Sequence, residues 1–193
     1  MADPDSPDRL IPRRVREERS QRGWTLAQLA ERAGVSRAMI SKIERGESSP
    51  TAALLARLGA AMGLGLSALM SAPRAPVPAL RRVDDQAVWT DPESGYVRRL
   101  VSPPGGEGDA EIVAIELPAG KAVTFAPSSG LRADEQVLLL EGALTLSGGD
   151  TTFDLRPGDC ARFESDHVQT FRNDGTTVAR YLVVKRHEPA PPG

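Results

Sequence analysis

The chain has 193 residues, of which 40% are apolar and 26% are charged, and its formal net charge is −2 at pH 7. This length and composition are typical of a globular protein with two small domains. No apolar run approaches the roughly 18 residues that a membrane-spanning helix needs, and the acidic, proline-rich start is unlike a secretory signal. The sequence therefore predicts a cytoplasmic protein with no membrane partner.

Basic residues are concentrated in the first part of the chain. Residues 1–72 contain 11 Lys and Arg against 8 Asp and Glu, whereas residues 73–193 contain 13 against 18. Within residues 9–57 the basic excess rises to 11 against 5. This distribution is expected of a small nucleic-acid-binding module joined to an acidic domain, although a solvated basic helix face gives the same counts.

Residues 9–70 are predicted to be helical, after eight residues that we expect to be disordered. Thr25 and Gln28 have the spacing of a capping box, which predicts that a helix begins at this point. Gly34 is expected to end this helix, because the turn that follows favours a residue without a Cβ atom. Ser36 is expected to cap the next helix. Two short helices joined by a glycine-containing turn predict a helix-turn-helix.

The second of these helices is predicted to have two unlike faces. Ile40 and Ile43 share the face that packs inward, which leaves the opposite face to Arg37, Ala38, Ser41 and Lys42. An arginine in the first turn of a helix that enters the major groove can donate two hydrogen bonds to guanine. Basic residues further along such a helix suit phosphates or a second base.

The stretch RSQRGWTLAQLAERAGVSRAMISKIERGESSPTAALLARLGAAMGL, which begins at Arg19, resembles the Xre-type helix-turn-helix family of phage repressors. The resemblance implies an all-α bundle of five helices over residues 9–70 that binds double-stranded DNA. It implies a structural ion pair between Arg19 and Glu44. The DNA contacts that it implies are Thr25, Gln28, Ser36, Arg37, Ala38, Ser41, Lys42 and Arg45. Gln28 has a competing role as a capping residue, and some bundles of this kind bind protein instead of DNA.

The second half of the chain changes its pattern. Residues 71–80 contain three prolines and are predicted to form a linker. Short β-rich runs such as EIVAIEL, QVLLLEG and ARYLVVK follow, separated by Gly, Pro, Asp and Asn, and they predict an all-β barrel or sandwich over residues 81–187. Cys160, the only cysteine, is expected to be a small buried strand residue. Residues 188–193 are predicted to be a disordered tail. The fold class is therefore a multidomain α + β protein.

Two corners in this half, Leu140-Glu141-Gly142 and Pro157-Gly158-Asp159, resemble those of the cupin superfamily. The resemblance implies a cupin barrel, also called a double-stranded β-helix, over residues 81–187. Its metal-binding members carry two histidines and a glutamate before the first corner and a third histidine before the second, a ligand set that suits Fe, Mn, Ni or Zn.

This chain departs from that ligand set. Only Glu135 fits it, because the first two histidine positions fall on Ser128 or Ser129 and on Gly130 or Leu131, and Gln169 stands at the third. His167 has the same strand parity as Gln169 and would become a ligand only through a shift of register. We therefore expect no metal and no other cofactor, and, since no nucleophile and base form a recognisable set, no enzymatic activity.

The barrel interior then becomes a candidate pocket for a small-molecule effector. Burying Glu135 alone would be costly, so we expect it to pair with an arginine, a water or a cationic or hydrogen-bonding group of a ligand, unless it is an exposed strand residue. The candidate arginines are Arg98, Arg99 and Arg132, and the sequence does not choose among them. The aromatic candidates are equally compatible with a plain core. The candidate pocket residues are Arg98, Phe125, Arg132, Glu135, Phe163, Gln169 and Phe171.

Together the two halves predict a transcriptional regulator that binds an operator as a homodimer, in which residues 81–187 both sense the effector and form the dimer. Its effector would act on the helical domain through residues 71–79. Two alternatives remain open. One is a metal-dependent cupin isomerase or dioxygenase with an accessory DNA-binding module, and the other is a regulator whose barrel only dimerises.

Overall fold

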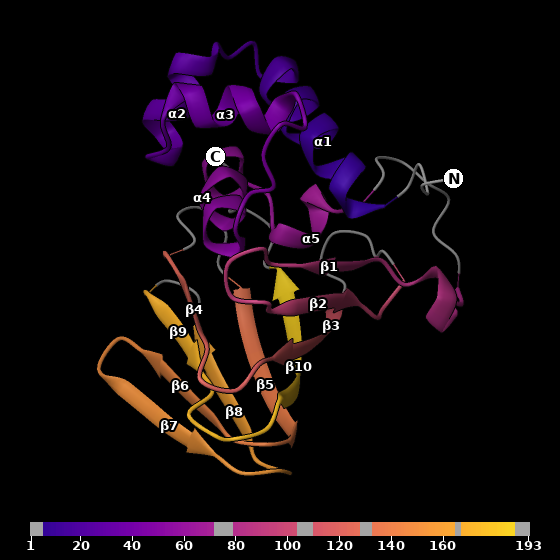
Figure 1. Ribbon diagram of the computed structural model, residues 1–193, viewed down its shortest axis with the longest axis vertical. Coiled ribbons are helices and arrows are strands. Elements are labelled where there is room, and N and C mark those ends of the chain that lie inside the picture. The colour runs from indigo at the N-terminus through magenta and orange to yellow at the C-terminus, as the bar shows by residue number, and fades with distance from the viewer. Residues whose placement is uncertain (1–5, 72–78, 104–109, 128–132, 165–166, 188–193) are drawn as a thin grey trace.

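A computed structural model describes residues 6–71, 79–103, 110–127, 133–164 and 167–187 of the chain (Figure 1). A group of helices, α1 to α5, comes first, and two antiparallel β-sheets follow. The predicted linker, the predicted tail and the first five residues lie largely or wholly outside the described residues. None of the helices that the structure describes is long and apolar enough to cross a membrane.

The helical domain begins earlier than the sequence predicts. Helix α1 spans Pro7–Gln21, so the prediction of disorder through residue 8 is wrong for Pro7 and Asp8. Proline at the first position of a helix sacrifices no hydrogen bond, because the first backbone N–H groups have no partner within the helix. Asp8 adds a negative charge in the first turn, where the helix dipole favours it.

The next two helices form the helix-turn-helix. Helix α2 spans Leu26–Ala33 and is preceded by a complete capping box, in which Thr25 Oγ1 accepts from Gln28 N and Gln28 Oε1 accepts from Thr25 N. Gly34 ends α2 with a φ of 62°, in the left-handed region. Helix α3 spans Arg37–Glu44, and Ser36 Oγ accepts a hydrogen bond from its third N–H. Local capping chemistry therefore fixes both ends of the connection.

Helices α4 (Ala52–Met62) and α5 (Leu66–Leu69) complete the five. Buried side chains from α1 to α5 form the core of this domain, among them Val15, Leu29, Ile40, Ile43, Leu55, Leu58 and Leu69. Arg14 and Arg22 both pair with the buried carboxylate of Glu18, and Arg22 also donates to the carbonyl of Met62 at the end of α4. These contacts fix α1 against the last helices.

The β domain follows a short 3-10 turn at Val83–Asp85. A six-stranded sheet has the order β1-β2-β3-β10-β5-β8, and a four-stranded sheet has the order β4-β9-β6-β7. The strands are β1 (Val88–Thr90), β2 (Val97–Leu100), β3 (Ala110–Leu117), β4 (Ala122–Phe125), β5 (Ala133–Glu141), β6 (Leu144–Gly148), β7 (Thr151–Leu155), β8 (Cys160–Glu164), β9 (Gln169–Arg172) and β10 (Ala179–His187). All described pairings are antiparallel.

The two sheets pack face to face through aromatic side chains. Phe171 on β9 stacks on Tyr181 of β10, with ring centroids 5.7 Å apart. Phe125 on β4 and Phe163 on β8 each meet the edge of Phe171, at 5.9 Å. Within the described residues no ladder joins the sheets, so the domain is a pair of facing antiparallel sheets and not a closed barrel, an arrangement consistent with the cupin resemblance.

Cys160 does not have the burial that the sequence predicts. It lies at the start of β8, as expected of a strand residue, but its side chain is exposed. Strand β8 stands at the edge of the six-stranded sheet and pairs with β5 alone among the described strands. An edge strand leaves one side to solvent, and a sequence pattern does not reveal which strands are edges.

Candidate functional sites

The first candidate site is a surface groove between the start of α2 and the outer face of α3. It is lined by Thr25, Leu26, Ala27, Arg37, Ala38, Ser41, Lys42 and Arg45. The structure thus brings together most of the side chains that the Xre resemblance assigns to DNA contact. Gln28 and Ser36 are exposed but lie outside this lining, and both act as caps. Helices α2 and α3 lie at the end of the molecule remote from the sheets (Figure 1).

The cations of this groove differ in what surrounds them. Arg37 and Lys42 are exposed, and no described residue forms a hydrogen bond or an ion pair with Arg37. Arg45 is held by Glu47, with Nε 2.6 Å from Oε1 and Nη2 2.7 Å from Oε2, and it also donates to Ser41 Oγ. These hydrogen bonds lower the pKa of the Glu47 carboxyl. Arg37 can therefore bind a new partner at once, whereas Arg45 must first release the carboxylate of Glu47.

Arg19 fixes α3 against the rest of the domain. Its Nε lies 2.6 Å from Glu44 Oε1 and its Nη2 lies 2.8 Å from Glu44 Oε2, so the two form the ion pair that the resemblance implies. Arg19 Nη1 also donates to the carbonyl of Trp24. The Trp24 ring lies beneath the guanidinium of Arg32, at 4.4 Å. Arg19 and Glu44 are thus engaged inside the domain.

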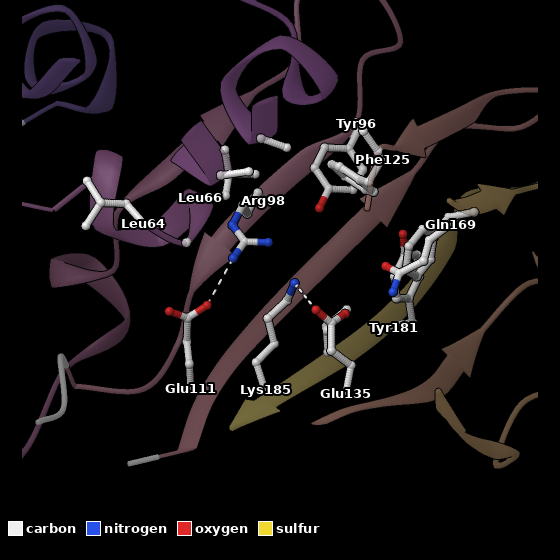
Figure 2. A pocket seen from close by; sticks show the side chains of 16 residues that line it. Leu64, Leu66, Tyr96, Arg98, Glu111, Phe125, Glu135, Gln169, Tyr181 and Lys185 are labelled. Atoms are coloured by element: carbon white, nitrogen blue, oxygen red, sulfur yellow. Dashed lines mark hydrogen bonds and ion pairs between the residues drawn. The ribbon is translucent and has the colours of Figure 1, made fainter. Parts of the chain in front are cut away.

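The second candidate site is a pocket between the two domains, called here the interdomain pocket (Figure 2). Helices α4 and α5 and the turn between them contribute Ala56, Ala60, Leu64, Gly65 and Leu66. The sheets contribute Tyr96, Arg98, Glu111, Phe125, Ala126, Glu135, Gln169, Phe171, Tyr181, Val183 and Lys185. The sequence placed the pocket inside the barrel and did not reveal its helical wall.

Glu135 is only 3% exposed, so it is not the exposed strand residue of the alternative reading. Among the described residues its partner is Lys185, whose Nζ lies 2.6 Å from Glu135 Oε1, and neither Arg98 nor Arg99. The two residues are cross-strand neighbours on β5 and β10. Arg99, adjacent to Arg98 on β2, does not line the pocket, and Arg132 lies outside the described residues.

Arg98 joins the two domains. Its Nη2 donates to Glu111 Oε1 at 3.0 Å and to Ser67 Oγ of α5 at 2.6 Å, and Ser67 Oγ itself donates to Glu111 Oε1 at 2.6 Å. Arg98 is 3% exposed, and its Nε is buried with no hydrogen-bond partner among the described residues. A buried donor without a partner carries a desolvation cost that a ligand acceptor would relieve.

Not every predicted pocket residue lines it. Phe125, Gln169 and Phe171 do, whereas Phe163 packs on Phe171 outside the lining. Gln169 is 5% exposed, so its amide is inside the pocket wall. The sequence missed Tyr96, Tyr181 and Lys185, which stand on strands β2 and β10 or just before them. Strand parity could have placed Lys185 on the face of the sheet that lines the pocket. It could not have placed Lys185 opposite Glu135, because that pairing depends on the register between β5 and β10.

The pocket does not have the donor set of a metal-binding cupin. Its described lining includes no imidazole, and the Lys185 ammonium beside Glu135 would repel a metal cation. His167 is exposed and lies beside Gly149 at the turn between β6 and β7. Within the described ranges no three His, Cys, Asp or Glu side chains are grouped so as to hold a metal ion. Ser128 to Leu131 lie outside these ranges.

Comparison with known families gives a match in each half of the chain. Residues 15–69 match the helix-turn-helix family, and residues 124–185 match the cupin domain family. The first range includes the groove of α2 and α3. The second includes Glu135, Gln169 and Lys185 of the interdomain pocket.

Individual proteins resemble the chain over different lengths. It is 29% identical over 173 residues to the HTH-type transcriptional regulator SutR of Escherichia coli strain K12, which covers 90% of this chain and 92% of SutR. It is 30% identical over 63 residues to the HTH-type transcriptional regulator SinR of Bacillus licheniformis, which covers 32% of this chain and 57% of SinR. A solved helix-turn-helix family transcriptional regulator from Vibrio cholerae has the same fold, with a TM-score of 0.74 at 24% identity, covering 96% of this chain and 97% of that protein.

Proposed function

We propose that the chain is an Xre-type helix-turn-helix transcriptional regulator with a C-terminal cupin domain, in which α3 binds the operator under the control of a small molecule in the interdomain pocket. The family matches confirm both resemblances predicted from the sequence. The observation that carries the proposal is the groove of α2 and α3, because its exposed lining is basic and small. Such a surface is complementary to phosphates and base edges and unsuited to an apolar protein partner.

The roles of the basic side chains follow from their positions on α3. Arg37 stands in the first turn, where a helix in the major groove meets base edges, and it has no described partner to exchange. Lys42 and Arg45 stand further along and are suited to phosphates. Thr25, at the start of α2, is placed for the DNA backbone beside them.

A homodimer is the proposed binding form. Two copies of α3 about 34 Å apart would read two half-sites one DNA turn apart, which is how helix-turn-helix dimers recognise near-palindromic operators. Sedimentation of the free chain and of its operator complex tests this assembly. A monomer in both sedimentation experiments, together with a footprint that covers a single half-site, would contradict it.

The DNA contacts are tested by operator binding with single substitutions. Arg37→Ala should weaken the preferred operator by about 1–3 kcal/mol and relax specificity at one base pair, since a base contact is lost. Lys42→Ala should weaken all sequences alike and reduce the salt dependence, since a phosphate contact is lost. Footprinting and titration over a set of operator variants measure both effects.

Arg82→Ala is the matched control, because Arg82 is also exposed but lies outside the helical domain. It should leave the affinity unchanged. If Arg37→Ala and Lys42→Ala also leave it unchanged, α3 is not the recognition helix.

The effector role rests on the pocket and is tested separately from DNA binding. A thermal-shift screen of metabolites should give ligands whose stabilisation is lost in Glu135→Ala and Gln169→Ala. No hit in a broad screen would favour a β domain that only dimerises.

The enzymatic alternative predicts stoichiometric Fe, Mn, Ni or Zn in the purified protein. The relatives SutR and SinR, which are named as transcriptional regulators, support a non-enzymatic function.

A further inference from the structure

The charged side chains of the interdomain pocket select a class of ligand. Resting on the effector role proposed above, we propose that the pocket binds a small amino acid as a zwitterion, with its carboxylate at Arg98 and its ammonium group at Glu135. Three features of the pocket support this ligand class: the order of its charges, the atoms without a described partner at the two ends of that order, and the apolar surface beside them.

The charges alternate in sign across the pocket wall. Glu111 on β3, Lys185 on β10 and Glu135 on β5 are cross-strand neighbours in one row, and Arg98 pairs with Glu111 at the near end. The sequence of charges is therefore positive, negative, positive, negative (Figure 2). The row is neutral as a whole, so an ion of either sign would add an uncompensated charge to a largely buried site. A zwitterion adds none.

The positive end offers the carboxylate site. Arg98 has a buried Nε with no described partner, and a carboxylate is the acceptor that a guanidinium binds most strongly. Lys185 lies next in the row, and within the described ranges its ammonium group donates one hydrogen bond, to Glu135. A carboxylate at this end would accept hydrogen bonds from Arg98 Nε and from the remaining N–H groups of Lys185.

The negative end offers the ammonium site. Glu135 is 3% exposed, and its Oε1 accepts a hydrogen bond from Lys185. No described residue donates a hydrogen bond to the second oxygen of this carboxylate. A protonated amine supplies such a donor together with a compensating positive charge. Gln169 and Tyr181 lie beyond Glu135 and offer further polar atoms (Figure 2).

The remaining walls are apolar and suit a hydrocarbon skeleton. The sheets contribute the rings of Phe125 and Phe171, and the helical domain contributes Leu64 and Leu66. The side of the pocket formed by Leu64 and Leu66 is called here the helical roof. A ligand whose charged groups occupied the row would therefore turn its carbon atoms toward this roof. This combination of a polar row and an apolar roof distinguishes an amino acid from a sugar or a nucleotide, which carry polar groups on every side.

Isothermal titration of the full chain with matched compounds tests the proposal. Leucine is compared with 4-methylpentanoate, which lacks the amine, and with 3-methylbutylamine, which lacks the carboxylate. The longer series is 6-aminohexanoate, hexanoate and hexylamine. In at least one series the zwitterion should bind about tenfold or more tightly than either single ion, since a charge-assisted hydrogen bond is lost in each.

Two variants assign the ends of the ligand. Arg98→Gln should remove the discrimination between the amino acid and the amine, and Glu135→Gln should remove the discrimination between the amino acid and the acid. Arg99→Gln is the matched control, because Arg99 stands on the same strand outside the pocket and should preserve both. Thermal unfolding of each variant shows that it is folded.

Equal binding of a single ion, or no binding by any of the six compounds, would overturn the amino-acid assignment. Neither result contradicts the effector role itself, because that role is tested separately by the metabolite screen with Glu135→Ala and Gln169→Ala. Discrimination that survives in both Arg98→Gln and Glu135→Gln would place the ligand elsewhere and overturn the assignment as well.

Discussion

Tyr96 and Tyr181 are the only tyrosines of the chain, and both face the interdomain pocket from buried positions. Burial raises the pKa of the Tyr96 phenol, although Arg98 opposes the rise, and burial raises the pKa of Tyr181 well above its ordinary value. Both phenols therefore remain protonated across the neutral range. They can donate a hydrogen bond to a ligand in the pocket.

The raised pKa values predict how stability depends on pH. Below the unfolded-state pKa of about 10, both states keep the phenolic protons, and the tyrosines do not alter the free energy of unfolding with pH. Above it the unfolded chain releases protons that the folded chain retains, so stability falls as pH rises toward the folded pKa. Absorbance titration should show no tyrosinate until the protein unfolds, in one cooperative step.

The matched measurement is the same titration in denaturant, where both phenols should ionise near pH 10. Tyr181→Phe should shift the alkaline unfolding to higher pH. Tyrosinate that forms in the folded protein near pH 10 would contradict the burial of these side chains.

Single residues of the pocket were predictable where a family pattern fixes their position along the sequence. Glu135 and Gln169 were identified because a family pattern fixes their positions, and both are buried in the pocket wall. The partner of Glu135 was missed because it depends on the register between β5 and β10, which pairs Lys185 with Glu135. Arg98, one of the three candidate arginines for Glu135, pairs with Glu111 instead, because β3 stands between β2 and β10.

Helix α4 makes one of the contacts between the domains. Its N-terminus has two acceptors: Thr51 Oγ1, which accepts from Leu54 N, and Asp91 Oδ2 of the β domain, which accepts from Ala52 N at 2.6 Å. Asp91 is 3% exposed, and its Oδ1 accepts from the backbone of Glu93 and Ser94. A carboxylate at a helix N-terminus also meets the positive end of the helix dipole.

Asp91→Asn should therefore destabilise the protein by about 1–2 kcal/mol, because one charge-assisted cap is weakened and an amide N–H faces the N–H of Ala52. Chemical denaturation of the full chain measures the change. Asp84→Asn is the control, since Asp84 is exposed and should have little effect. Equal stabilities of Asp91→Asn and the wild type would mean that this cap contributes nothing to the docking of α4.

The helices were the most predictable elements because their signals are local. Thr25, Gln28, Gly34 and Ser36 act within a few residues of their own positions, and each has the role that the sequence predicts. Asp91 lies 39 residues from the helix that it caps, and nothing in its neighbourhood marks it as a cap. Contacts of this kind depend on the tertiary fold.

At the scale of the whole molecule, the helical domain contributes both the groove of α2 and α3 and one wall of the interdomain pocket. The sequence placed the coupling between domains in residues 71–79, most of which lie outside the described residues. The structure adds a second route, because Leu64, Leu66 and Ser67 of the helical domain touch the pocket or its charged row. A ligand that prefers one position of the roof would bias the helical domain directly, and DNA would bias ligand binding by the same factor.

Ser67 is the residue at which this coupling can be interrupted. Its Oγ lies between Arg98 and Glu111, and in the Ser67→Ala variant the pocket keeps its charged row while α5 loses its hydrogen bonds to that row. In the wild type, the tightest ligand of the metabolite screen should change operator affinity by about fivefold or more, the lower range of measured allosteric couplings. In Ser67→Ala that ratio should fall toward one while the ligand still binds. Ser147→Ala, on β6, is the control and should keep the wild-type ratio. An unchanged ratio in Ser67→Ala would mean that the signal passes through residues 71–79 or through the dimer, and not through the contact of α5 with the charged row.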